Sequence, residues 1–254
     1  MKGFFAFGLA AAVSWQGVAV ADGQERFSNQ SIAQLESVDD SARPGEGQAS
    51  IRLDEGEDIP FYSGRDESAL AIGPGGSVAH LSLYDSATVA MTGGEVSHFN
   101  AYDDSEVTIS GLVDVSHFSF NDAATGKLSG AVNISHLTFS DMATGELSGG
   151  TFGFLNVTGE TVVDIRKMTI EGGSLITPDL TVPGGALTLG ENARVNLYAS
   201  DVAFSDGQLS GKWMDGTTFA FAVVMRMFSE VDEGSFVLPT SMPEQIVVLA
   251  GEEP

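Results

Sequence analysis

The chain has 254 residues, of which 35 are acidic and 11 basic, and its formal net charge is −24. Hydrophobic residues make up 43% of it, enough for a folded core in one large domain or two small ones. The acidic excess argues against nucleic acid and anionic membranes as partners, because a polyanion is repelled by both. Cysteine is absent, which excludes thiol catalysis, disulfide bonds and cysteine-based zinc sites.

The first 21 residues have the pattern of a secretory signal peptide. Lys2 supplies the positive start, residues 3–15 form a short apolar run, and Ala19-Val20-Ala21 matches a cleavage site. The apolar run is too short to span a bilayer comfortably, although an uncleaved N-terminal anchor is the alternative. We therefore expect an exported protein, secreted or at the cell surface, with no membrane span in the mature chain.

A polar, acidic and weakly periodic stretch follows at 22–58, and we expect a flexible leader or a loose N-terminal cap there.

Sequence repeats follow this stretch. All four histidines of the chain recur at intervals of 18, 19 and 19 residues, as His80, His98, His117 and His136. Five residues after each histidine stands an aspartate, and these are Asp85, Asp103, Asp122 and Asp141.

Each repeat contains two short segments in which apolar and polar residues alternate, bounded by Gly, Asp and Ser. This pattern indicates strand, turn and strand. One repeat cannot bury its apolar side alone, so successive repeats should stack about 4.8 Å apart. We predict an all-β fold, a parallel β-solenoid (β-helix) over residues 59–199 with about two strands per coil. Its core rows are expected to be Leu81–Phe99–Phe118–Leu137 and Met91–Ile109–Leu128–Leu147.

The later repeats carry one extra residue between the glycine and the histidine, as GLVDVSH at 111–117 shows against GGEVSH at 93–98. A turn tolerates an insertion and a strand loses its register, so we expect a turn at this point. One more coil is predicted after the fourth histidine, with Phe154 at the histidine position and Gly159 at the aspartate position.

Residues 200–254 are expected to form a C-terminal antiparallel β module and tail. Two or three strands should be joined by turns at Asp206-Gly207 and Asp215-Gly216, because Asp-Gly pairs favour tight hairpins. The last stretch, 243–254, adds one further strand in this prediction and then frays.

The histidines point away from the core by parity and should form a ladder on one sheet face. Neighbouring imidazoles are ligands for Zn²⁺, Ni²⁺ or Cu²⁺, but a straight column brings together two ligands more easily than the three or four that zinc usually takes. The alternative is a row of stacked, half-exposed rings that duplication has copied. A third hypothesis is pH sensing.

The aspartates pose a separate problem, because carboxylates stacked about 4.8 Å apart repel one another. Each lies at a turn, where its side chain can accept a hydrogen bond from the amide two residues on. The alternative to this turn capping is Ca²⁺ that bridges adjacent coils through carboxylate and carbonyl oxygens.

The favoured function is a non-enzymatic, exported solenoid for surface display, adhesion or extracellular-matrix assembly, with extracellular glycan or matrix components as partners. Exposed aromatic and small polar side chains near the histidines suit carbohydrate contact, namely Tyr84, Tyr102, Asn100 and Thr138. Self-assembly through an exposed solenoid end is also expected.

Two alternatives remain open. A polysaccharide-active β-helix enzyme would need acidic residues in a groove beside Arg166 or Lys167. A divalent-metal-binding module would use the histidine or aspartate column. No catalytic residue is assigned, since the sequence contains neither G-x-S-x-G nor H-E-x-x-H.

A resemblance adds to this interpretation. The run G-G-x-V-x-H, followed by Y-D and then V-x-[IM]-[ST], occurs at 75–92 and 93–110. It resembles tandem repeats of exported bacterial proteins, notably secreted proteins with PEP-CTERM sorting signals and autotransporter passengers. Residues 195–221 are similar to the strand pair that often closes such arrays. The resemblance implies a secreted solenoid of the cell surface or matrix. The apolar helix and basic tail of that sorting signal are not found, so sorting through it is not expected.

Overall fold

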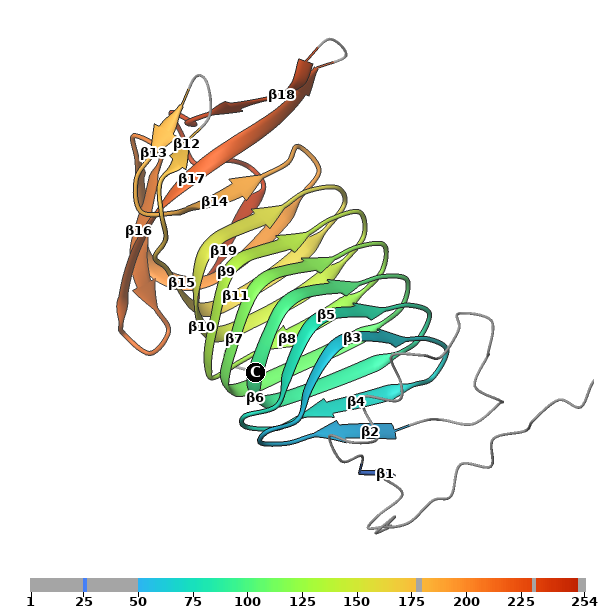
Figure 1. Ribbon diagram of the computed structural model, residues 1–254. Coiled ribbons are helices and arrows are strands. Elements are labelled where there is room, and N and C mark those ends of the chain that lie inside the picture. The colour runs from blue at the N-terminus through green and yellow to red at the C-terminus, as the bar shows by residue number, and fades with distance from the viewer. Residues whose placement is uncertain (1–24, 27–49, 177–179, 230–231, 251–254) are drawn as a thin grey trace, which may run out of the picture.

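The structure is a computed structural model that describes residues 25–26, 50–176, 180–229 and 232–250. Over these residues the secondary structure is entirely β, and the chain winds into successive coils stacked along one axis (Figure 1). Equivalent strands of neighbouring coils pair in parallel, mostly with 18 or 19 residues between partners, as His80 with His98 and His98 with His117. The predicted parallel β-solenoid is confirmed. No helix that is long and apolar enough to cross a membrane occurs in the described part of the chain.

Two parallel stacks of strands make up the solenoid. We name them the first stack and the ladder stack. The first stack contains β2 (Ser50–Leu53), β4 (Ala69–Ile72), β8 (Thr125–Leu128), β15 (Arg194–Ser205) and β19 (Ile246–Leu249), together with the beginnings of β6 (Thr88–Ala101), β7 (Glu106–Phe120), β10 (Thr144–Val157) and β11 (Val162–Ile170). The end of β11 pairs with the ladder-stack end of β10. The ladder stack contains β3 (Asp58–Gly64), β5 (Ser77–Leu83), the ends of β6, β7 and β10, and β9 (Ala131–Phe139), β14 (Ala186–Leu189) and β17 (Thr218–Ser229).

The core lies between the two stacks and consists of the inward-facing residue of each alternating pair. Both predicted rows are in register, Leu81–Phe99–Phe118–Leu137 on the ladder stack and Met91–Ile109–Leu128–Leu147 on the first stack. Every one of these side chains is at most 1% exposed. Burial of a side chain of this size stabilises the fold by about 1.5–3 kcal/mol, so these rows contribute substantially to the stacking of the coils.

Phenylalanine and glycine are matched in volume across the core. Phe120 and Phe139 stack at 4.7 Å between ring centroids, in two adjacent coils. Opposite them, the first stack has Gly126 and Gly145 where the next coil has Val163. A Cβ on Gly145 would lie 2.6 Å from Cζ of Phe139. The glycines therefore leave the space that the two rings fill.

In the repeat of Gly111 the extra residue lies inside a strand, whereas in the repeat of Gly130 the residues Ser129 and Gly130 separate β8 from β9. β6, β7 and β10 each continue unbroken from the first stack to the ladder stack, and the register between β6 and β7 shifts between Met91 and Gly93. Gly111 of β7 has a φ of 96° at this point. For the repeat of Gly111 the prediction of a turn is wrong, because a β-bulge with glycine at positive φ takes up the added residue while pairing resumes on both sides.

The ends of the solenoid differ from the predicted boundaries. Ser50–Leu53 pairs in parallel with Ala69–Ile72, so the solenoid starts in the predicted leader (22–58) rather than at residue 59. β1 (Glu25–Arg26) adds a short pairing to β2. The predicted signal peptide, 1–21, and residues 27–49 of the leader lie outside the described residues.

At the C-terminal end, β15, β16 (Gln208–Trp213), β17 and β18 (Asp232–Val237) pair antiparallel, which confirms the predicted cap. The turns at Asp206-Gly207 and Asp215-Gly216 are also confirmed, with positive φ at Asp206, Gly207 and Gly216. This cap is not separate from the solenoid, however. β17 and β19 also pair in parallel with β14 and β15, so both continue the stacks. A small hairpin of β12 (Leu175–Ile176) and β13 (Thr181–Val182) lies nearby.

Candidate functional site

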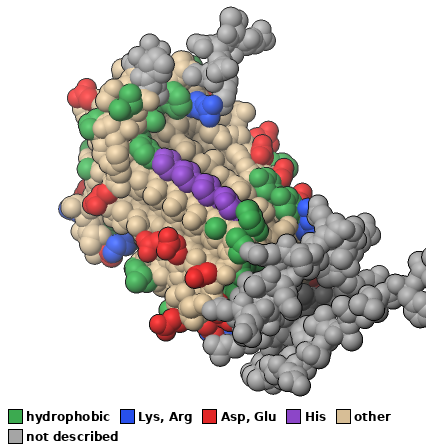
Figure 2. Space-filling view, in the orientation of Figure 1, with side chains coloured by type: hydrophobic (Ala, Val, Ile, Leu, Met, Phe, Trp, Pro, Cys, Tyr) green, Lys and Arg blue, Asp and Glu red, His purple; other side chains and the backbone are tan. Residues whose placement is uncertain are grey.

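The four histidines form a single file on the outer face of the ladder stack (Figure 2). Their ring centroids are 4.9, 5.0 and 4.8 Å apart, and the last two pairs of rings are within 4° of parallel. All four side chains are exposed. The spacing follows directly from the parallel register, because equivalent residues of adjacent coils lie one strand separation apart. The predicted ladder is confirmed.

Phenylalanines extend this file at both ends. Phe61 stacks on His80 and Phe154 stacks on His136, each at 5.1 Å between ring centroids. The second of these was predicted and the first was missed, although Phe61 precedes His80 by the repeat interval of 19 residues. We name the file from Phe61 to Phe154 the ring ladder. Phe61 is 73% exposed and leaves one aromatic face open at the N-terminal end.

Stacking determines which part of each imidazole is free. The ring faces are turned toward the rings of neighbouring coils, so the edges, which carry the nitrogen atoms, face outward. A neutral imidazole offers one N–H donor and one acceptor. Stacking of sugar rings on these aromatic faces is therefore restricted to the ladder ends. Along its length the ladder presents hydrogen-bonding edges at intervals of about 5 Å.

The predicted contact residues lie beside the ladder. Asn100 and Thr138 belong to one column two positions after the rings, in which Ser82, Asn100, Ser119, Thr138 and Asn156 are in register. Tyr84 and Tyr102 form a second column, stacked at 5.2 Å with the Arg65 guanidinium 4.5 Å from the Tyr84 ring centroid. Burial raises the pKa of the Tyr102 hydroxyl, and the neighbouring Tyr84 and Asp122 raise it further.

Proton uptake by the ladder is opposed by its own geometry. Burial lowers the pKa of His117 below its ordinary value of 6.5, and positive charge on His136 and His98 lowers it further. Like charges in adjacent rungs disfavour the protonated form. At neutral pH this direction favours a neutral ring at His117, with one donor and one acceptor edge.

The lowered pKa of His117 predicts a loss of stability in mild acid. The unfolded chain binds a proton first as the pH falls through about 6.5, so this contribution is complete above that pH and decreases below it. We expect the free energy of unfolding to fall less between pH 7.5 and 5.5 in His117→Gln than in the wild type. Urea unfolding at both pH values measures this change in the free energy of unfolding. Ser119→Gln, on the same face of the sheet, is the control. Equal losses in both variants would contradict the assignment.

Metal binding by the ladder has little geometric support. Parallel rings one rung apart direct their nitrogen lone pairs along parallel planes rather than toward one centre. In the described ranges, no group of three or more His, Asp or Glu side chains is placed to hold a metal ion. A zinc site would need three or four ligands around one point.

The four predicted aspartates form a second column at the turns, and Asp66 of the preceding coil belongs to it. All five have φ between 54° and 61°. The carboxylates of the four later aspartates accept backbone amides, but the donor is not the one predicted. The N–H of Asp66 donates to Asp85 Oδ2 at 3.2 Å, and that of Asp85 to Asp103 Oδ2 at 3.0 Å. The N–H groups of Asp103 and Asp122 donate in the same way to Asp122 and Asp141, both at 3.4 Å.

This column connects neighbouring coils. The expectation of capping two residues on, within the same turn, is wrong because the left-handed aspartate turns its N–H toward the next coil. A hydrogen bond to a carboxylate is stronger than one between neutral groups. Each contact therefore offsets part of the repulsion between stacked carboxylates without requiring Ca²⁺.

Substitutions at Asp103 separate these contributions. Asp103→Ala removes the acceptor and strains a left-handed residue, and we expect it to lower the free energy of unfolding by about 2 kcal/mol. Asp103→Asn keeps an acceptor oxygen and a side chain that tolerates this φ, so the change should stay within about 0.5 kcal/mol. Urea unfolding in EDTA and in Ca²⁺ measures both. An Asn variant as unstable as the Ala variant, with a Ca²⁺ effect only in the wild type, would favour calcium bridging instead.

Arg166 and Lys167, the basic residues of the enzyme hypothesis, are both in ion pairs. Arg166 Nε is 3.0 Å from Glu146 Oε1, and its guanidinium lies 4.2 Å from the Tyr198 ring centroid. Lys167 Nζ is 2.6 Å from Asp215 Oδ2, which lowers the pKa of Asp215 strongly. These contacts connect β11 with adjacent parts of the first stack and with the cap.

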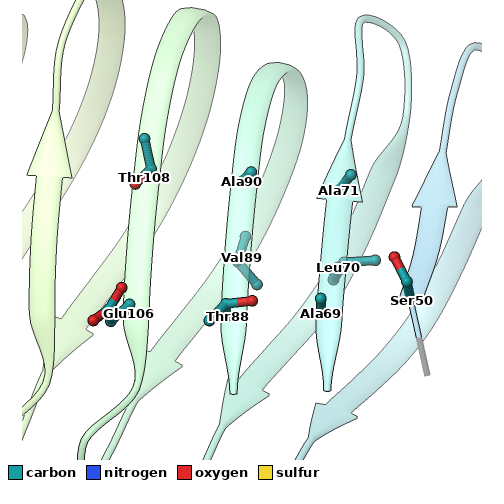
Figure 3. Close-up of a pocket in the computed structure, with 9 residues that line it drawn as sticks. All are labelled: Ser50, Ala69, Leu70, Ala71, Thr88, Val89, Ala90, Glu106 and Thr108. Carbon is teal, nitrogen blue, oxygen red and sulfur yellow. The ribbon is translucent and has the colours of Figure 1, made fainter. Parts of the chain in front are cut away.

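A shallow depression of about 220 Å³ lies on the outer face of the first stack, near its N-terminal end (Figure 3). It exists because Ala69, Ala71 and Ala90 are small beside the longer Thr108 and Glu106. Neither Arg166 nor Lys167 lines it, and among the described residues that line it Glu106 is the ionisable one. This depression therefore does not provide the acid and base pair that the enzyme hypothesis needs.

Comparison of the chain with protein-family models, with curated proteins and with solved structures finds no match.

Proposed function

We propose that this chain is an exported, non-enzymatic binding protein whose ring ladder contacts extracellular polysaccharide in adhesion or matrix assembly. The observation that supports the proposal is the row of exposed imidazole edges, repeated every 4.8–5.0 Å in a straight line. Sugar hydroxyls both donate and accept hydrogen bonds, as neutral imidazole edges do. Hydroxyls and amides of the adjacent Ser, Asn and Thr column add further partners.

A linear polymer fits this surface better than a compact ligand does. The outer face of the ladder stack carries a histidine ring in four successive coils, 4.8–5.0 Å apart. Single contacts of this kind are weak because water competes for each hydrogen bond. Several contacts along one polymer chain add up, since the first one raises the local concentration for the next.

The test is binding to a panel of neutral and acidic glycans, soluble and insoluble, at pH 7.5 and 5.5. We expect the double variant His98→Ala, His117→Ala to lose at least tenfold in affinity for the glycan that the wild type binds. Lys127→Gln, on the outer face of the first stack, is the matched control and should bind normally. Circular dichroism checks that each variant is folded.

The same incubations decide between adhesion and catalysis. New reducing ends in the glycan, produced by the wild type, would contradict the non-enzymatic proposal. Glycan binding that the double variant retains would contradict the role of the ladder.

A further inference from the structure

The surface around the ring ladder is free of carboxylates, in a chain with 35 acidic residues. We define the ladder strip as the rings together with the columns one position before and two positions after them. These residues are Phe61, His80, His98, His117, His136 and Phe154, then Pro60, Ala79, Ser97, Ser116, Ser135 and Gly153, then Ser63, Ser82, Asn100, Ser119, Thr138 and Asn156. Figure 2 shows the same thing, with the histidine row crossing a field without acidic side chains next to it.

Charged groups border this strip on both sides. Three positions before the rings stand Asp58, Glu95 and Asp114, in one column with Asn133, whose amide nitrogen donates to Asp114 Oδ1 at 3.0 Å. Five positions after the rings runs the aspartate column, in which the four later carboxylates already accept backbone amides. Between the rings and that column lie Arg65, Tyr84 and Tyr102. Within the strip the imidazoles are the ionisable side chains, and histidine is the side-chain type whose charge ordinarily changes between pH 5 and 8.

This arrangement selects the shape and the charge of a ligand. A broad polyanion would meet the carboxylates on either side, whereas a narrow chain that lies along the axis meets only the strip. Protonation of the imidazoles converts the centre of the strip into a line of positive charges 4.8–5.0 Å apart. Without a ligand these charges repel one another, which agrees with the lowered pKa of His117. Anionic groups placed along the line would remove that repulsion.

We propose that the ladder strip binds a linear acidic polysaccharide, one that carries carboxylate or sulfate groups along its chain, and that binding takes up protons onto the ladder. This rests on the proposed function and specifies its ligand class. By linkage, a ligand that prefers the protonated ladder must raise the pKa of His117, which the neighbouring rings lower, so the affinity of the ligand increases as the pH falls. At pH 7.5 the acidic protein and the acidic chain repel each other.

The experiment is isothermal titration calorimetry of the full chain with polygalacturonate, dextran sulfate and neutral dextran at pH 5.5 and 7.5, at constant ionic strength. Two buffers of different ionisation enthalpy give the number of protons taken up. We expect polygalacturonate or dextran sulfate to bind at least tenfold more tightly at pH 5.5 than at 7.5, with net proton uptake. The two acidic polymers distinguish carboxylate from sulfate as the recognised group.

The variants make the result specific. The double variant His98→Ala, His117→Ala should lose both the pH-dependent affinity and the proton uptake, and Lys127→Gln should keep both. Binding that is independent of pH, occurs without proton uptake or persists in the double variant would overturn the inference. Ladder-dependent binding of a neutral glycan with no preference for acidic chains would overturn it while the proposed function stands. If neither class binds, both fail.

Discussion

Replacing Gly145 by valine is expected to destabilise the protein by about 2–3 kcal/mol. The new side chain would have to occupy the space of the Phe139 ring, because a Cβ at this position already lies 2.6 and 2.7 Å from two ring carbons. Replacing Phe139 by valine should also destabilise the protein, by about 2–4 kcal/mol, since a cavity replaces most of the ring. Urea unfolding followed by far-UV circular dichroism measures both changes.

The double variant Phe139→Val, Gly145→Val is the decisive control. The next coil has Val157 in register with Phe139 and Val163 in register with Gly145, so the double variant reproduces a combination that this solenoid already uses. We expect it to be more stable than either single variant, with a favourable coupling of about 2 kcal/mol. Additive losses would show that the phenylalanine and the glycine are not matched in volume.

Gly111→Ala is the second large effect that we expect, a loss of about 3–5 kcal/mol. Gly111 lies at the β-bulge of β7 with a φ of 96°. A Cβ there would collide with the carbonyl oxygen of Thr92 in the preceding coil, and a backbone carbonyl cannot move aside without loss of pairing. Unfavourable φ and overpacking then act together.

Gly56→Ala separates these two causes. Gly56 has a φ of 81°, and a Cβ there meets no atom within 4 Å. The free energy of unfolding of this variant should fall by only about 1–2 kcal/mol, the cost of holding an alanine in the left-handed conformation. Urea unfolding measures the loss in free energy of unfolding for both variants. The difference between the two losses is due to the contact between coils. Similar losses in the two variants would contradict the importance of that contact.

The sequence was sufficient to predict the stacking and the core rows. The repeat interval fixes which residues are in register, and strict alternation determines which of them face inward, so His98 and Phe99 could be placed on opposite faces. The ladder of four rings follows from the same two facts. The turns at Asp206 and Asp215 were also predictable, because their residue types limit the backbone conformation.

Features that depend on space between coils were not predicted. The amides that donate to the aspartates were predicted in the wrong place, two residues on in the same turn. A sequence pattern does not show that the N–H of Asp85 turns toward Asp103 in the next coil. The early start of the solenoid at Ser50 was missed, since SIRL lacks the histidine and the Tyr-Asp pair that mark the later repeats. The match of Phe139 with Gly145 was missed too, although both repeats that have phenylalanine three residues after the histidine also have the glycine six residues later.

The parallel register has a consequence for how such a protein changes in length. Since neighbouring coils pair in the same parallel register, a further copy of the repeat can enter between two existing coils and leave the pairing of the others undisturbed. Each such copy would add one imidazole to the file and lengthen the binding surface by one rung. Natural variants of this protein are therefore expected to differ by whole coils, and so in the length of polymer that the ring ladder can contact.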